Sequence, residues 1–285
     1  MKQFLKIIFE LGKVRISLPV ALSALSGYVL YSGKMDGQGL LLSVGVFFMS
    51  CGSGALNHWQ ERKTDALMPR TKNRPIPSGQ FSPAQGLMVV LGYTLTGSLI
   101  LVLSNPTVAL VLSWATLVSY NLIYTPLKKV TAFAVIPGSL VGALPPLIGW
   151  TAAGGNLLAP SILIVATFFF IGQIPHFWLL LLLFGDQYKL AGLQSLTDIF
   201  SELQIKRITY TWVLTTIASA FLVLYFVIAQ PVILVLLLLY IFYLLFTLTR
   251  DVFFQEKFKV LPAFYKLNFL YLFMMLFLIA DSLLG

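Results

Sequence analysis

Long apolar runs, each close to the length a helix needs to cross a bilayer, recur along almost the whole chain. A membrane-spanning helix requires about 20 mostly apolar residues. Runs of this kind lie near 16–33, 39–58, 84–104, 107–124, 132–152, 160–184, 208–229, 231–249 and 266–284. Only Gln230-Pro231 separates the seventh run from the eighth. The pattern predicts an all-α fold, a polytopic membrane helix bundle of about nine transmembrane helices around a central cavity, in a single domain spanning 1–285.

The first 15 residues have a different pattern. Apolar and basic positions alternate with helical spacing, so that they form two faces: Phe4, Ile7, Ile8 and Leu11 on one, and Lys2, Lys6 and Lys13 on the other. An amphipathic helix with a basic polar face is typical of segments that lie in the membrane interface. We therefore expect residues 1–15 to form an N-terminal interfacial segment.

The composition agrees with a chain surrounded by lipid. Hydrophobic residues make up 58% of the sequence and charged residues 10%, whereas soluble domains carry about 25% charged residues. The lone cysteine, Cys51, cannot form an intramolecular disulfide, and the sequence contains no Cys/His spacing typical of a metal site.

The net charge of +9 could indicate a nucleic-acid partner, but the positions of the basic residues argue against one. If the N-terminus is cytoplasmic, the N-terminal segment and the loops after spans two, four, six and eight carry 18 of the 19 Lys and Arg residues. Such a bias is the positive-inside pattern. It predicts a multi-pass protein of the cytoplasmic (inner) membrane with a cytoplasmic N-terminus, and no nucleic-acid partner.

The most informative polar stretch runs from Asn57 to Gly79. Asn57, Glu61 and Asp65 are spaced four residues apart, so they share one helix face. Pro69 then ends the helix. Two carboxylates and an amide are hard oxygen ligands that suit Mg²⁺, which also binds substrate phosphates.

Five basic residues lie within the 13 positions from 62 to 74, among and directly after the acidic residues: Arg62, Lys63, Arg70, Lys72 and Arg74. Guanidinium groups bind phosphate oxygens in a bidentate manner, so the two features together indicate a diphosphate site. The alternative is an ordinary positively charged cytoplasmic loop with incidental salt bridges.

The spacing Asn-x-x-x-Glu-x-x-x-Asp, followed by Met68-Pro69-Arg70-Thr71 and Arg74-Pro75, resembles the first acidic motif of the UbiA-type intramembrane prenyltransferases. Three further blocks are similar to one branch of that family, the heme O synthases (protoheme IX farnesyltransferases): Tyr124–Lys129, Gly142–Trp150 and Gln173–Trp178. The resemblance covers roughly residues 10 to 200, and the remaining spans match only in hydropathy.

The resemblance implies a prenyltransferase with Mg²⁺ as cofactor, farnesyl diphosphate and heme B as substrates, and downstream heme enzymes as partners. It implies a metal site formed by Asn57, Glu61, Asp65 and Asp186, with Arg70, Arg74 and Lys128 binding the diphosphate. The further binding positions that it implies are His176, Arg62, Lys189 and Tyr124.

The chain departs from the family pattern in its second acidic motif. Gln187 stands where the heme branch has an acidic residue before Tyr188, and Asp186 lies one position earlier. On a helix, one position turns a side chain by about 100°. Glu61, Ala134, Gln194 and Thr197 also replace the residues usual in that branch.

His58 and His176 are the only histidines. A single histidine on an apolar helix is most often a packed residue, which is the interpretation we give His58. His176 follows Pro175, which we expect to break the sixth span and free a backbone carbonyl at a cavity wall. Its imidazole could then contact heme iron or a propionate.

Three alternatives remain open at this point: an aromatic quinone precursor as acceptor, a non-catalytic porphyrin-binding relative, and a transporter. Transporters place charged residues near the membrane midplane, whereas here the charges cluster at one rim.

Overall fold

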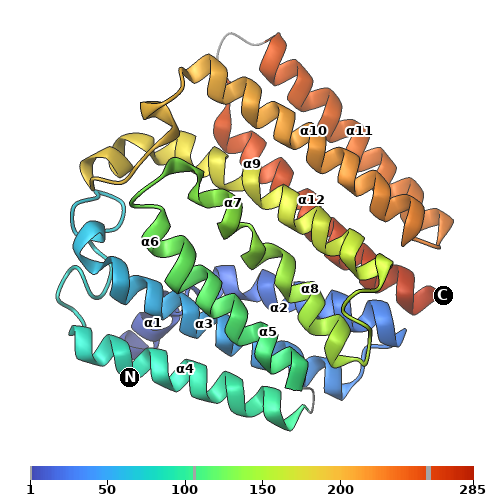
Figure 1. The fold of residues 1–285 in the computed structure, drawn as a ribbon, viewed down its shortest axis with the longest axis horizontal. Coiled ribbons are helices and arrows are strands. Elements are labelled where there is room, and N and C mark those ends of the chain that lie inside the picture. The colour runs from blue at the N-terminus through green and yellow to red at the C-terminus, as the bar shows by residue number, and fades with distance from the viewer. Residues whose placement is uncertain (1, 105–106, 255–257) are drawn as a thin grey trace.

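The computed structural model describes residues 2–104, 107–254 and 258–285 as an assembly of helices (Figure 1). In this part of the chain, nine helical segments are long and apolar enough to cross a membrane, which confirms the nine predicted spans. Seven are single helices: α2 (Val14–Ser32), α3 (Gly37–Asp65), α4 (Pro83–Leu103), α9 (Pro160–Leu190), α10 (Glu202–Phe226), α11 (Pro231–Phe253) and α12 (Val260–Leu284).

The fourth and fifth spans are composite. The fourth consists of α5 (Thr107–Val118), a π-helix (Ser119–Tyr124) and α6 (Thr125–Leu127). The fifth consists of a 3₁₀ turn (Ala132–Ala134), α7 (Val135–Gly138) and α8 (Leu140–Ala152). Irregular helical backbone at membrane depth is tolerated where it is buried in protein or lines a cavity, and both segments contribute to the cavity described below.

Local sequence signals account for several span boundaries. Ser82 and Ser201 begin α4 and α10 with capping boxes, which satisfy the free amides of a first helical turn. Pro231 occupies the first turn of α11, where a missing amide hydrogen has no consequence. The buried Asp281 carboxylate accepts hydrogen bonds from the amides of Ala229 and Gln230. The boundary that rested on Gln230-Pro231 is therefore confirmed.

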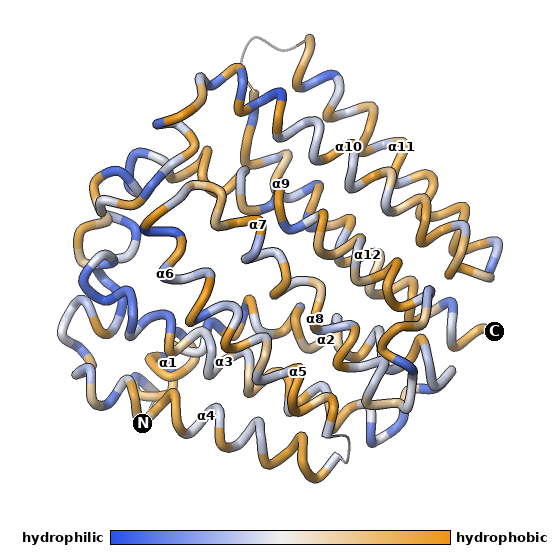
Figure 2. Tube along the Cα trace, in the orientation of Figure 1, coloured by the Kyte–Doolittle hydropathy of each residue, from blue (hydrophilic) through white to orange (hydrophobic). Residues whose placement is uncertain are grey.

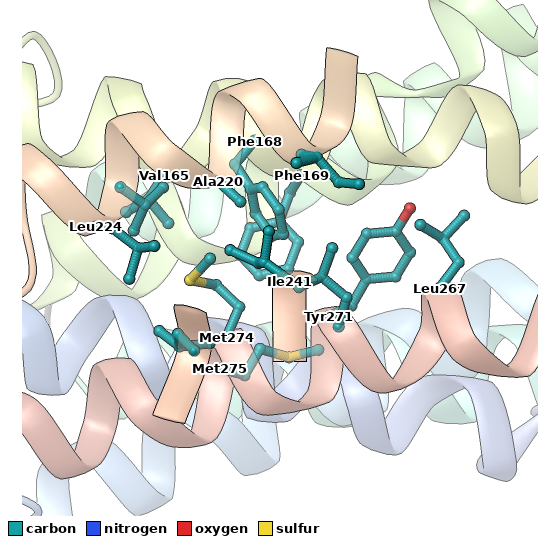
Figure 3. Close-up of a cluster of buried hydrophobic side chains, with 14 of the residues drawn as sticks. Val165, Phe168, Phe169, Ala220, Leu224, Ile241, Leu267, Tyr271, Met274 and Met275 are labelled. Carbon is teal, nitrogen blue, oxygen red and sulfur yellow. The ribbon is translucent and has the colours of Figure 1, made fainter. Parts of the chain in front are cut away.

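The helices enclose a central space. α2 packs on α3 and α8, α8 packs on α9, α9 packs on α12, and α12 returns to α2. α4 covers the outside of α3, and α10 and α11 cover α9 and α12 (Figure 1). Figure 3 shows the apolar core between these last helices, where Val165 and Phe168 meet Ala220, Ile241 and Met274.

Hydrophilic positions gather at the end of the bundle that carries the N-terminal helix α1 (Lys2–Leu11), the end of α3 and the loop between α9 and α10 (Figure 2). α1 buries Ile7 and Leu11 against a cluster that includes Phe81 and Tyr93. Lys257, one of the predicted cytoplasmic basic residues, lies outside the described residues.

The prediction that Pro175 breaks the sixth span is wrong, because α9 continues through it from Pro160 to Leu190. Proline in a membrane helix is accommodated when neighbouring groups satisfy the freed carbonyls. Here the Tyr271 hydroxyl donates a hydrogen bond to the Gly172 carbonyl in the turn before Pro175.

Glycines set the contact between α2 and α8. A Cβ atom built on Gly149 would lie 1.7 Å from the carbonyl oxygen of Ala24, and one on Gly27 would lie 1.9 Å from that of Pro146. Small residues allow this approach of helix backbones in membranes.

Gly149→Ala is expected to destabilise the protein by about 3 kcal/mol or more, since the added methyl forces backbone apart rather than a flexible side chain. The measurement is thermal unfolding in detergent. Gly92→Ala is the matched control, because a Cβ at Gly92 meets nothing within 4 Å. Equal unfolding midpoints for the two variants would contradict the close packing of α2 and α8.

Candidate active site

The central space is a cavity of about 1400 Å³. Its wall includes residues of α1, α2, α3, the two composite spans, α9 and α12. One end is lined by charged side chains. The inner part is lined mainly by apolar residues, among them Val46, Met49, Ile148, Phe169 and Leu272.

The acidic face predicted from the sequence is present on the last three turns of α3. Asn57, Glu61 and Asp65 all line the cavity, and their exposed fractions are only 1%, 6% and 1%. Carboxylates this deeply buried require compensating charge or hydrogen bonds.

Two basic residues from different parts of the chain supply that compensation, and a third binds the neighbouring amide. Lys13 Nζ donates to Asn57 Oδ1 at 2.6 Å. The Lys128 ammonium contacts the Glu61 carboxylate, and Arg74 Nη1 donates to Asp65 Oδ2 at 2.7 Å. Arg74 and Lys128, which the resemblance assigns to diphosphate binding, thus lie at the acidic face.

The two lysines are held in different electrostatic environments. Burial lowers the pKa of Lys13 to about 7, and the nearby Arg74 guanidinium acts in the same direction. Burial would also lower the pKa of Lys128, but the Glu61 carboxylate outweighs it and raises that pKa above its usual value. An anion entering the cavity would favour the charged form of Lys13.

Lys13 was expected on the polar face of an interfacial helix and not at the site. In the structure it lies between α1 and α2 and lines the cavity. The residue adopts left-handed backbone angles, φ 47° and ψ 45°, at the junction of α1 and α2. This bend turns the side chain toward Asn57. No periodic pattern in the sequence could have indicated it, because the residue lies between two helices.

The π-helix at Ser119–Tyr124 also escaped prediction. Its Asn121 side chain is fully buried and exchanges hydrogen bonds with Ser53 at 2.6 and 3.1 Å. Its amide also donates to Gln60 Oε1, and Gln60 Nε2 donates to the Asn121 carbonyl oxygen. These contacts fix the π-helix against α3.

This π-helix presents an aromatic wall to the cavity. Tyr120 and Tyr124 stack with ring centroids 5.5 Å apart, and Tyr124 lies 5.4 Å from Phe177 of α9. Thr125 follows directly, and its hydroxyl accepts a hydrogen bond from Asn57 Nδ2 at 3.2 Å. π-helical turns are frequent at functional sites, and here the turn joins the aromatic wall to the acidic face.

His176 lines the cavity on α9, as expected, with Gln173 one turn away and Asn268 of α12 beside it. Its ring centroid lies 4.9 Å from that of Phe264. Its Nδ1 atom has no hydrogen-bond partner among the described residues, and the same is true of His58 Nδ1.

Asp186 is not brought to the site. It is exposed and does not line the cavity, whereas Tyr188, two positions later, does. The adjacent Gln187 side chain accepts a hydrogen bond from the Arg70 backbone amide at 3.1 Å. Across the described residues, no three His, Cys, Asp or Glu side chains form a metal-binding group. The offset in the second acidic motif therefore turns this carboxylate away from the cavity.

Arg62 and Lys189 also lie away from the cavity. Arg62 donates to the Trp59 carbonyl at 2.6 Å and stacks over the Trp59 ring. Lys189 pairs with Asp198 at 3.1 Å, with both side chains substantially exposed. Arg70 does line the cavity mouth, where its guanidinium lies 4.3 Å from the Phe184 ring centroid.

A bundle of membrane helices around a large cavity, apolar inside and with paired acidic and basic groups at one end, defines a class of intramembrane protein with room for an amphiphilic ligand. The chain belongs to the UbiA prenyltransferase family, whose model matches residues 20–276. It is therefore a multi-pass membrane protein.

Comparison with individual proteins places the chain near two bacterial relatives. It is 38% identical over 184 residues to the protoheme IX farnesyltransferase of Oleidesulfovibrio alaskensis, a match covering 65% of each chain. It is 38% identical over 165 residues to that of Nitratidesulfovibrio vulgaris, covering 58% of each. The matched region thus spans less than two thirds of these relatives.

Among solved structures, a UbiA homologue from Archaeoglobus fulgidus bound to GPP and Mg²⁺ superposes with a TM-score of 0.72. The alignment covers 98% of this chain and 100% of the other at 13% identity. At this identity the likeness establishes the fold, and the all-α prediction is confirmed.

Asn121→Ala is expected to lower the free energy of unfolding by about 2–4 kcal/mol, because the buried side chain makes three hydrogen bonds to partly buried partners on α3. Thermal unfolding in detergent measures the effect. The control is Asn73→Ala, since Asn73 is exposed in the loop after α3. An unfolding midpoint equal to that of the control would show that the π-helix does not depend on this network.

Proposed function

We propose that this protein is a Mg²⁺-dependent prenyltransferase of the cytoplasmic membrane that transfers a farnesyl group from farnesyl diphosphate to a vinyl group of heme B. The observation that carries the proposal is the buried face of Asn57, Glu61 and Asp65, with its basic partners, at the mouth of a largely apolar cavity. The positive-inside pattern supports a cytoplasmic N-terminus, with this mouth on the cytoplasmic side.

The donor set at this face suits a magnesium ion that is shared with a substrate. It offers two carboxylates and one amide oxygen, all on the cavity side of α3. Mg²⁺ in phosphate-transfer sites is commonly held by one or two carboxylates and completed by water and substrate oxygens. Bound there, the metal would neutralise charge on the diphosphate and make it a better leaving group. The Mg²⁺ and GPP in the Archaeoglobus structure support this assignment.

The basic residues would bind the diphosphate directly. Arg74 and Lys128 already contact the acidic face, and Arg70 lies at the mouth. Positioned cations stabilise the negative charge that develops on a leaving group as the C1–O bond breaks. The same residues would then retain the diphosphate while the allylic group reacts.

The aromatic wall would protect the allylic cation. Tyr120, Tyr124 and Phe177 present rings to the cavity. Ring faces attract cations, more strongly when water is excluded. The apolar inner wall excludes water and leaves the acceptor as the nearest nucleophile.

The acceptor is inferred from the relatives and from the inner cavity. Both bacterial relatives are protoheme IX farnesyltransferases. Pockets for a single drug-sized ligand occupy about 300–1,000 Å³, so a cavity of about 1400 Å³ has room for two substrates. The vinyl carbon would attack farnesyl C1, and the resulting benzylic-type cation would add water and release a proton, giving a hydroxyfarnesyl side chain.

The test is an assay of the purified protein in detergent with farnesyl diphosphate, Mg²⁺ and heme B, followed by mass spectrometry. The expected product is a porphyrin heavier by one farnesyl group plus water, absent when Mg²⁺ is chelated. Asp65→Ala is expected to lower the rate at least 100-fold, because it removes a carboxylate and leaves Arg74 unpaired.

Asp186→Ala is the matched control and is expected to retain the wild-type rate, because that carboxylate is exposed outside the cavity. Full activity in Asp65→Ala would refute the metal-site assignment. Turnover with an aromatic quinone precursor, and none with heme B, would keep the mechanism and reject the acceptor.

His176→Ala is expected to weaken heme B binding about tenfold while leaving diphosphate binding unchanged. The imidazole lies on the wall of the inner cavity, and its Nδ1 has no hydrogen-bond partner within the described part of the chain. Titration of the heme Soret absorbance measures the first, and calorimetry with inorganic diphosphate and Mg²⁺ measures the second. Asn73→Ala, in the exposed loop after α3 and outside the cavity lining, is the control. Equal losses of both ligands would assign His176 a structural role.

A further inference from the structure

The proposed reaction makes two opposing demands on water. The cavity must keep bulk water from the allylic cation, yet the cation that forms on the acceptor must gain one water molecule to become an alcohol. A site that binds a single water molecule beside the acceptor meets both demands. Much of the inner wall cannot provide such a site, because side chains such as Val141, Ile148 and Leu272 carry no hydrogen-bonding group.

Three polar side chains on this wall form what we call the inner polar patch: Gln173 and His176 of α9 and Asn268 of α12. Two hydroxyls that also line the cavity, those of Ser113 and Thr116, each donate at 2.8 Å to a carbonyl one turn back on their own helix. Their hydrogens are therefore already engaged. The side chains of the inner polar patch are better placed to bind a ligand.

The Gln173 side chain is held by packing and keeps its amide free. A Cβ atom built on Gly142 would lie 2.4 Å from Gln173 Cγ and 3.0 Å from its Nε2, so the glycine makes room for this side chain. Beside it, the Tyr271 hydroxyl donates to the Gly172 carbonyl and fixes α12 against α9. Among the described residues, the hydrogen bonds at this contact do not use the Gln173 amide. The amide thus keeps donors and an acceptor for a molecule in the cavity.

Asn268 and His176 place the rest of the patch next to the aromatic wall. Asn268 Nδ2 donates to the Phe264 carbonyl at 2.8 Å, which leaves its Oδ1 atom to accept a hydrogen bond from the neighbouring His176 imidazole. The centroid of the His176 ring lies 5.7 Å from that of Phe177, which in turn lies 5.4 Å from that of Tyr124. The inner polar patch therefore adjoins the rings that face the allylic cation.

We propose that Gln173, His176 and Asn268 bind the water molecule that converts the acceptor cation into an alcohol. The inference rests on the proposed function and adds to it the residues that decide which product forms. A buried water molecule typically makes about three hydrogen bonds, and the two amides and the imidazole can supply them. Gln173 and Asn268 are positioning residues in this scheme, because they act on the cation through the water.

The capture step follows prenyl transfer. Farnesyl C1 has then bonded to the terminal vinyl carbon, the diphosphate has left, and the positive charge lies on the vinyl carbon next to the macrocycle. The oxygen of the bound water donates a lone pair to that carbon and forms the C–O bond, and one of its protons passes to the imidazole of His176, since histidine is the commonest general base. Without a bound water, the same cation loses a proton from the adjacent CH₂ group and becomes an alkene, lighter by one water molecule.

The first experiment identifies the source of the hydroxyl oxygen. The purified full-length protein in detergent receives farnesyl diphosphate, Mg²⁺ and heme B in water labelled with heavy oxygen. We expect the alcohol product to carry one labelled oxygen atom by mass spectrometry. Wild-type product carried through the same work-up in labelled water corrects for later exchange or loss of water.

The second experiment measures the ratio of alcohol to alkene in two variants, Gln173→Met and Asn268→Leu. Each is expected to lower this ratio about tenfold or more, because each removes part of the site that orients the water. The consumption of farnesyl diphosphate is expected to fall much less than the ratio does, because the charged end of the cavity is unchanged. Thr116→Val is the matched control and is expected to keep the wild-type ratio, because it changes a cavity hydroxyl that is already bonded to the Leu112 carbonyl.

The outcomes separate this inference from the proposed function. If the wild-type protein forms no farnesylated porphyrin, the proposed function fails, and this inference fails with it. If it forms an alcohol whose oxygen is unlabelled, or if both variants keep the wild-type ratio, only the inference is overturned.

A loss of total product with an unchanged ratio would also overturn it, since the two residues would then bind the acceptor or support the fold. Asn268→Leu leaves the Phe264 carbonyl without its hydrogen bond. If that variant does not fold, Gln173→Met decides, because it leaves no described group unpaired.

Discussion

The burial of charge at one end of an otherwise apolar bundle is the constraint on which the rest of this structure depends. Asn57, Glu61 and Asp65 lie on the last turns of α3, almost fully excluded from solvent. Removing one partner of a buried ion pair typically costs about 3–5 kcal/mol, so the surrounding segments must deliver a basic group to each carboxylate. The loop that carries Arg74 and the helix end that carries Lys128 meet this requirement, and the bend at Lys13 brings a third basic group to the Asn57 amide.

The regular parts of the molecule could be predicted from the sequence because their physical signals are local. Runs of apolar residues identify the nine spans, and a spacing of four residues places Asn57, Glu61 and Asp65 on one face. What the sequence could not show depends on contacts between distant segments. Lys13 is turned by a backbone bend, the π-helix is held by Asn121 against α3, and α9 passes unbroken through Pro175 beside Tyr271.

Asp186 shows that helix periodicity can indicate a change in the direction of a side chain without identifying which residue faces the cavity. The shift of one position relative to Tyr188 implied a turn of about 100° around the helix, but the sequence could not say which residue would face inward. In the structure Tyr188 lines the cavity, Asp186 is exposed, and Gln187 binds the backbone of Arg70. The helix α9 therefore contributes a neutral contact to the loop after α3, where a second carboxylate was expected.

This loss of a carboxylate changes the electrostatics of the whole site. With a second acidic motif in place, the carboxylates could balance more of the basic groups and hold a metal without an anion. In the part of the chain that the structure describes, the cavity wall carries three acidic residues (Glu10, Glu61 and Asp65) and six basic ones, so the site has an excess of positive charge. Such an excess raises the local concentration of anions at the mouth of the cavity. The carboxylate that α9 does not provide at the cavity therefore leaves this mouth more favourable to an anion than a second acidic motif would.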